Sequence, residues 1–194
     1  MTIAIIMLYF LISTVQPIYA NNSLILEIVG ERKTENSFIM QNIELLFNNE
    51  DGTFLLGDDN GLLEFTVEDI KHLKAVLEKY LNWEEIAVTN QVEIYKEIPE
   101  SIFDTKILYK KKNNDEYIKE NIIFKMLFYS VNENEHYLVI EGRMFEKRTF
   151  GLLDEPYFIS KDSVKEIYNS ISEENIEKYI KEYENRIKIE ELFK

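Results

Sequence analysis

Residues 121–140, NIIFKMLFYSVNENEHYLVI, contain two apolar runs joined by a short polar segment. Alternate residues of the first run form one apolar face, which consists of Ile122, Phe124, Met126 and Phe128. The opposite face is also largely apolar and carries Ile123, Leu127, Tyr129 and Val131. A strand with two apolar faces is typical of the middle of a sheet. The segment NENE at 132–135 predicts the turn of a long antiparallel hairpin.

Further strands are predicted on the N-terminal side of this hairpin, because residues of high β-propensity alternate there between short polar connections. These strands are LILEIV at 24–29, SFIMQNIELLF at 37–47, TFLL at 53–56, GLLEF at 61–65, QVEIYKEI at 91–98 and TKILYKK at 105–111. The strand at 91–98 is expected to end before Pro99. The second strand of the hairpin, HYLVIEGRMFEKRTF, is expected to span 136–150.

Three segments have the apolar period of an amphipathic helix. The first is predicted at 67–82, with Thr66 and Asp69 forming a capping box at its start. The other two are predicted at 161–171 and beyond residue 172, with Ser160 and Ser172 as their N-caps.

These elements predict an α+β fold, in which the central and C-terminal helices pack on one face of an antiparallel sheet of hairpins. A duplicated sheet-plus-helix unit, with halves 21–90 and 91–194, is left open, although no aligned motif relates the halves. The layout resembles doubled sheet-plus-helix modules such as the PUR and whirly folds in its topology alone. That resemblance implies a nucleic-acid-binding module as one alternative function.

Residues 1–20, MTIAIIMLYFLISTVQPIYA, have the pattern of a secretory signal peptide, an uncharged apolar run that ends at a small residue. We expect cleavage after Ala20, a single domain at 21–194, and a periplasmic or secreted location. The alternative is an uncleaved anchor or a first strand of the fold. The apolar run is shorter than the ~20 residues that a membrane-spanning helix needs. No stable membrane span is expected after the leader is cleaved.

Composition narrows the classes of function. The chain has no cysteine, so it forms no disulfide and no thiolate metal site. Its formal net charge of −14 opposes binding to nucleic acid, which normally needs a basic face. The cluster Lys110, Lys111 and Lys112 is followed at once by polar and acidic residues, and it is interpreted as a solvated hairpin tip.

Residues 48–61, NNEDGTFLLGDDNG, raise the question of calcium binding. Neither glycine-closed cluster places oxygen ligands in the register of an EF-hand loop. The pairs Asp51-Gly52 and Asn60-Gly61 instead predict two-residue hairpin turns. A looser calcium site at Asp58 and Asp59 is left open, and no other metal and no cofactor is expected.

Catalytic motifs are absent from the sequence. The two histidines, His72 and His136, are interpreted as surface residues, and neither a zinc-binding histidine spacing nor a GxSxG motif occurs. A carboxylate-based hydrolase is the enzymatic alternative, and its candidate acids are Glu84, Glu85, Glu141, Asp154 and Glu155. Trp83 is expected to close the end of the first helix over the core.

The sequence therefore favours an exported, non-enzymatic protein that binds another protein or an envelope component. A candidate interaction face lies in the last helix, where apolar residues recur at helical spacing: Ile176, Tyr179, Ile180, Tyr183 and Ile187. Such a stripe is rarely left in water, so it either docks on the protein's own sheet or contacts another chain.

Overall fold

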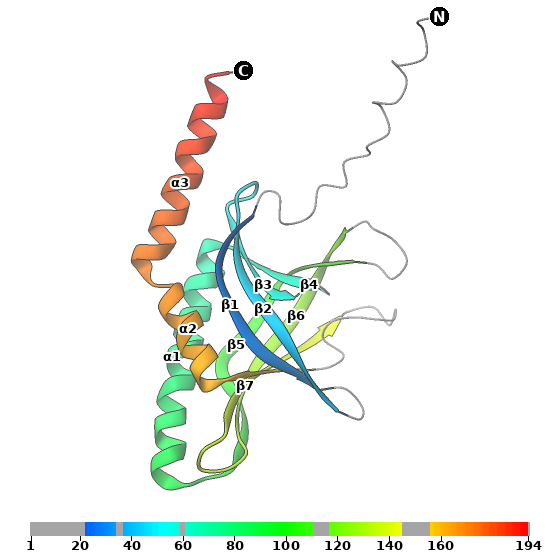
Figure 1. The fold of residues 1–194 in the computed structure, drawn as a ribbon, viewed down its shortest axis with the longest axis vertical. Helices are drawn as coiled ribbons and strands as arrows, with labels where there is room; N and C mark the ends of the chain where they lie inside the picture. The colour runs from blue at the N-terminus through cyan, green and yellow to red at the C-terminus, as the bar shows by residue number, and fades with distance from the viewer. Residues whose placement is uncertain (1–21, 34–36, 59–60, 111–116, 145–155, 194) are drawn as a thin grey trace, which may run out of the picture.

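In the part of the chain that the structure describes, an eight-stranded antiparallel sheet closes on itself into a barrel and carries three helices (Figure 1). The computed structural model describes residues 22–33, 37–58, 61–110, 117–144 and 156–193. The predicted α+β class is confirmed. Closure of the sheet was not predicted, because it depends on a pairing between its first and last strands.

The strands follow one another around the barrel in sequence order, and each pairs antiparallel with the next. They are β1 (Asn22–Lys33), β2 (Phe38–Asn48), β3 (Thr53–Asp58), β4 (Gly61–Phe65), β5 (Ile94–Lys110), β6 (Tyr117–Ser130), β7 (His136–Met144) and β8 (Tyr157–Ser160). The barrel closes where Gly30, Glu31 and Arg32 of β1 pair with Ile159, Phe158 and Tyr157 of β8.

Helix α1 (Val67–Asn90) connects β4 to β5, and it is longer than the predicted helix at 67–82. The predicted capping box at its start is confirmed, because Thr66 accepts from the Asp69 amide and Asp69 accepts from the Thr66 amide. The prediction ended too early because the buried stripe continues through Glu84, a charged residue. This carboxylate is buried on α1 and is neutralised by the Lys161 ammonium, 2.5 Å away.

Helices α2 (Lys161–Ser170) and α3 (Glu173–Glu191) follow β8, and they begin at the predicted N-caps Ser160 and Ser172. Helix α2 packs beside α1, and α3 continues past one end of the barrel (Figure 1). Inward-facing side chains of the strands form one core with α1, α2 and the start of α3. The helices thus cover and complete the core of the curved sheet.

Strand β5 continues through Pro99, so the predicted break before this residue was wrong. The ladder with β6 pairs Glu97 with Leu127 and resumes at Ile102 with Lys125. Four residues of β5, 98–101, therefore face the single residue Met126 in a β-bulge. Proline is tolerated at such a point because it has no ladder hydrogen bond to donate.

Two features of the bulge hold it in place. Glu100 adopts a left-handed backbone with φ 63°. Ser101 is fully buried, and its hydroxyl donates to the Met126 carbonyl at 2.7 Å and accepts from the Met126 amide at 3.2 Å. The side chain of Ser101 therefore replaces the backbone partner that Met126 would have in a regular ladder.

The turns of the acidic segment differ from the predicted ones. Asn48 pairs with Thr53, so the first connection has four residues, 49–52, rather than two. The Asn48 side chain accepts from the Glu50 amide at 2.9 Å, which organises this longer turn. Gly61 pairs with Asp58 and belongs to β4 rather than to a turn, and residues 59 and 60 lie outside the described ranges.

Candidate binding surface

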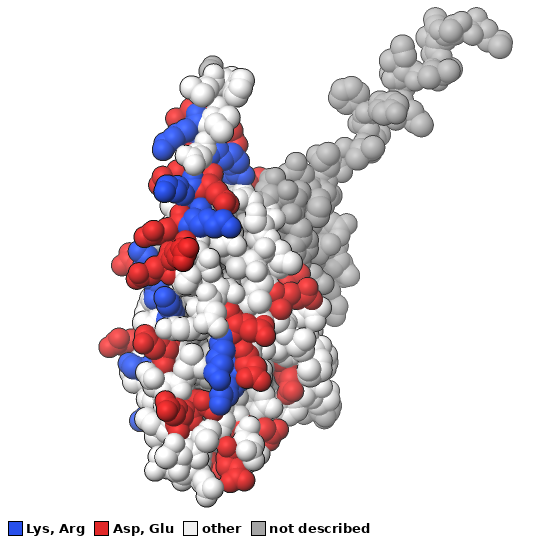
Figure 2. All heavy atoms as spheres, turned by 60° about the vertical axis from the view of Figure 1, so that its left-hand side comes forward, with Lys and Arg blue, Asp and Glu red and all other residues white. Residues whose placement is uncertain are grey.

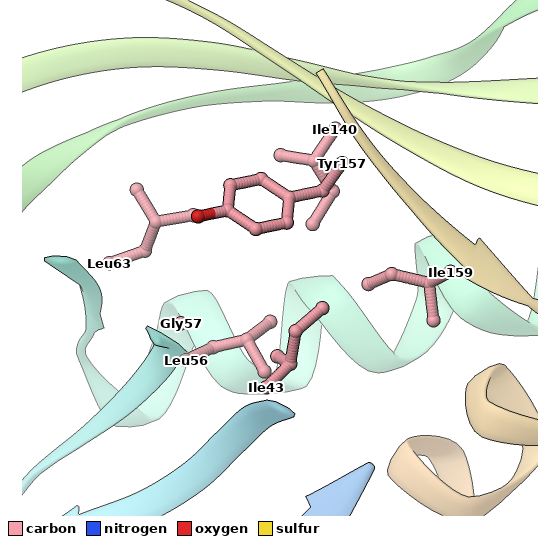
Figure 3. Close-up of a pocket in the computed structure, with 7 residues that line it drawn as sticks. All are labelled: Ile43, Leu56, Gly57, Leu63, Ile140, Tyr157 and Ile159. Carbon is pink, nitrogen blue, oxygen red and sulfur yellow. The ribbon is translucent and has the colours of Figure 1, made fainter. Parts of the chain in front are cut away.

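Inward-facing side chains of the strands form the main core of the barrel, and a small cavity lies among them. That cavity has a volume of about 10 Å³, enough for roughly one water molecule. Figure 3 shows its lining, which consists of Ile43, Leu56, Gly57, Leu63, Ile140, Tyr157 and Ile159. A small-molecule function for this cavity is therefore not supported.

A polar contact lies beside this cavity and joins two strands across the barrel. The Tyr157 hydroxyl donates to Asp58 Oδ2 at 2.9 Å, and both residues are buried. Burial and the neighbouring Asp58 charge raise the pKa of Tyr157, so the phenol stays protonated as a donor. Asp58, one of the calcium candidates, thus faces a tyrosine, whereas Asp59 lies outside the described residues and the calcium hypothesis stays a prediction.

The outer face of β6, β7 and β8 carries a second, smaller apolar cluster. Leu127, Val139 and Phe158 are its buried members, and Tyr129 and Tyr137 pack against them. These residues point outward because their sequence neighbours face the main core and successive strand residues alternate. The outer face of these three strands, where polar side chains are expected, is therefore apolar.

Aromatic rings extend this cluster across the neighbouring strands. Phe38 and Tyr129 make edge contacts with Phe158, with centroids 5.4 Å and 6.1 Å away. Tyr137 contacts the same ring at 5.9 Å, and Tyr95 contacts Tyr129 at 5.3 Å. We call these five residues the aromatic face. Its two ends are open to solvent, since Phe38 is 56% and Tyr95 52% exposed.

A groove of about 310 Å³ adjoins the aromatic face where the bulge displaces β5. We call it the charged groove, and its lining includes Glu97, Ile102, Lys125 and Glu141. The Lys125 ammonium lies 3.4 Å from Glu97 Oε2 and 3.7 Å from Glu141 Oε2. The Tyr95 hydroxyl donates to Glu141, which links the groove to the aromatic face.

The chemistry of the charged groove favours binding over acid–base catalysis. Lys125 lies within ion-pair distance of both carboxylates, and each of the three side chains is between a third and half exposed. A hydrolase needs one acid held protonated beside an ionised one, which requires a drier and more asymmetric setting. Glu97 and Glu141 are instead two similarly exposed carboxylates that face the same lysine.

Helix α3 places the predicted interaction face mostly against its own barrel. Ile176 is buried, and Tyr179 stacks on Phe47 of β2 with ring centroids 5.4 Å apart. The Tyr183 hydroxyl donates to the Glu50 carbonyl at 3.3 Å. The remaining members, Ile180 and Ile187, are half-buried. Beyond the barrel the helix end is open, with Leu192 and Phe193 largely exposed.

The other candidate residues are dispersed. His136 is buried rather than exposed and stacks on Phe128, so its assignment to the surface was wrong. His72 is half-buried beside Phe103, and Trp83 packs edge-on against Phe128. Glu84 is bound to Lys161 and Glu85 is exposed, whereas 111–112 and 154–155 lie outside the described ranges.

The sequence missed the aromatic face because its members come from five strands, β2 and β5 to β8, and are spread over residues 38–158. The signal that could have indicated it was the apolar second face of the strand at 121–131, including Leu127 and Tyr129. That face was interpreted as buried within a two-sided sheet. In the structure it belongs to the outside of a barrel.

Charges on the helical side are mixed. In the view of Figure 2, lysine and arginine alternate with aspartate and glutamate along the helices, and no continuous basic surface appears. Within the described ranges no three histidine, aspartate or glutamate side chains gather as metal ligands would. None of the helices in that part of the chain is long and apolar enough to cross a membrane. Comparison of the chain with protein-family models, curated proteins and solved structures finds no match.

Proposed function

We propose that the protein is an exported, non-enzymatic binding protein and that its partner is another protein, which docks on the aromatic face. The observation that carries the proposal is a row of aromatic rings on the outside of a barrel whose inward-facing side chains form a packed core. Exposed aromatic residues are enriched at protein interfaces, because a large rigid ring buries much area at little entropic cost.

The arrangement of the face supports this role. Buried Leu127, Val139 and Phe158 form a rigid base, and the more exposed Phe38 and Tyr95 lie at its two ends. Met40 is 63% exposed on β2, where it lies in register with Glu31 of β1. An apolar centre with charged groups at its edge is the usual composition of a binding surface.

The face also suits docking of a folded partner or an extended segment rather than strand addition. Tyr129, Tyr137 and Phe158 lie where their strands are paired on both sides, so the aromatic face leaves no free edge for a partner to extend. Side chains rather than backbone amides must therefore supply the contacts. This makes recognition dependent on a few rings, and single substitutions should reveal it.

The test is site-specific photo-cross-linking in the native host. A photoreactive phenylalanine analogue is placed at Tyr95, at Phe38, or at Glu182 of α3 as an exposed control. We expect one discrete protein adduct from the first two positions and none from the third. The adducted protein, identified by mass and purified, should lose affinity for the Tyr95→Ser variant at least tenfold.

Two results would overturn the proposal. Equal adducts from Glu182 would show that cross-linking reports mere proximity. Undiminished binding of the purified partner to Tyr95→Ser, with the thermal midpoint of the variant unchanged, would show that the aromatic face is not used.

A further inference from the structure

We infer that the partner segment bound beside the aromatic face is cationic and inserts an arginine or lysine side chain into the charged groove. This inference rests on the proposed function and adds the chemistry of the partner. It combines the volume of the groove, the charges of its lining and the Tyr95 ring at its border.

The groove has an excess of negative charge. Two carboxylates, Glu97 and Glu141, share the single ammonium of Lys125 at 3.4 Å and 3.7 Å. These distances are longer than a close charged hydrogen bond, which measures about 2.7–2.9 Å. Both acids therefore keep lone pairs that a second cation can approach.

Carboxylates beside the aromatic face also favour a cationic partner. Glu31 lies between Phe158 and Met40 in the register of β8, β1 and β2, on the same outer face. The negative charges of Glu31 and Glu135 raise the pKa of Tyr137, after the larger effect of burial. Among the described side chains, carboxylates thus flank the aromatic face, and a cationic partner complements them.

Arginine fits this place better than lysine. Its planar guanidinium can donate two hydrogen bonds to a carboxylate from one edge while its face stacks on an aromatic ring. Tyr95 presents such a ring, since it is 52% exposed and is held by its hydrogen bond to Glu141. The groove volume of about 310 Å³ is enough to admit a guanidinium and part of its stem.

The chain offers a matched control for general electrostatics. A second open groove, of about 340 Å³, lies on α3 and is lined by both acids and lysines, including Glu177, Lys178, Lys181 and Glu182. The double variants Glu97→Gln/Glu141→Gln and Glu177→Gln/Glu182→Gln remove the same amount of charge from two similar surfaces. Only the first should affect a partner that uses the charged groove.

The probes are fluorescent octa-arginine, octa-lysine and octa-glutamate peptides, measured by anisotropy at physiological salt with each protein. We expect octa-arginine to bind the natural chain best and octa-glutamate not to bind. The Glu97→Gln/Glu141→Gln variant should weaken octa-arginine binding about tenfold, as two partly exposed ion pairs allow, and the α3 variant less than twofold. Amide shifts in nuclear magnetic resonance should change around Lys125 and Tyr95.

Equal weakening by the two double variants, or no binding of octa-arginine, would overturn the inference. So would binding of octa-glutamate that depends on Tyr95. The proposed function fails separately: if the cross-linked partner binds through Tyr95 but its contacting segment carries no arginine or lysine, the aromatic face stands and the cationic chemistry is wrong.

Discussion

Ser101 of the β5 bulge should be a major determinant of stability, although it is a single hydroxyl. Its oxygen satisfies both the amide and the carbonyl of Met126, at 3.2 Å and 2.7 Å, in a place with no exposed surface. Ser101→Ala leaves both backbone groups without this partner. Each unsatisfied buried group costs about 1–3 kcal/mol, so we expect the loss of both partners to lower the free energy of unfolding by about 2–6 kcal/mol.

The assay is urea denaturation followed by tryptophan fluorescence and circular dichroism. Thr89→Ala is the matched control, because the Thr89 hydroxyl also donates to a backbone carbonyl, that of Glu85 at 2.8 Å, but at the exposed end of α1. Water replaces that bond, so its loss should cost less than about 0.5 kcal/mol. A Ser101→Ala variant as stable as Thr89→Ala would refute the view that the hydroxyl completes the ladder.

The remaining predictions concern the bulge, the docked helix, the buried phenols and the leader. Glu100→Gly should raise the free energy of unfolding by up to about 1 kcal/mol, since glycine adopts φ 63° without strain, and urea denaturation checks this. Tyr179→Ala should lower it by about 2 kcal/mol, because the half-buried ring stacks on the core, whereas Tyr179→Phe should leave it unchanged in the same assay. Burial raises the pKa values of Tyr80 and Tyr157, so these phenols keep their protons in the folded state above pH ~10 while the unfolded chain loses them. Stability should therefore be constant below that pH and fall above it, and a thermal-melting series should show a smaller fall in Tyr80→Phe. Intact-mass measurement of protein from the native host should show a chain that begins at Asn21, and a chain that retains the first twenty residues would contradict the signal peptide.

Local physics made much of the fold predictable. Helix starts were correct because Thr66, Ser160 and Ser172 satisfy free amides within one turn, and such caps can be recognised from neighbouring residues. The long hairpin was correct because alternation and the NENE turn lie within twenty residues of each other. The strand at Pro99 was divided wrongly, because a proline cannot be recognised as part of a bulge until its opposite residue, Met126, is known.

The candidate surface was less predictable, for a related reason. Alternation indicates that a strand has two faces, but it does not say which face points into a core until the curvature of the sheet is known. Leu127 and Phe128 are adjacent and both buried, yet one lies in the outer cluster and the other in the main core. Glu97, Lys125 and Glu141 meet only because β5, β6 and β7 are neighbours.

The pairing of β1 with β8, which closes the barrel, comes late in the folding of this protein. It consists of three residue pairs that join residues 30–32 to residues 157–159. Strand β1 therefore has no second neighbour until β8 has been synthesised. Such distant pairing slows folding. Until then β1 is an open edge that other chains can extend. A chain that leaves the ribosome or a membrane channel N-terminus first would therefore expose the edge of β1 until β8 emerges. A chaperone that covered this edge would prevent aggregation most effectively during that interval.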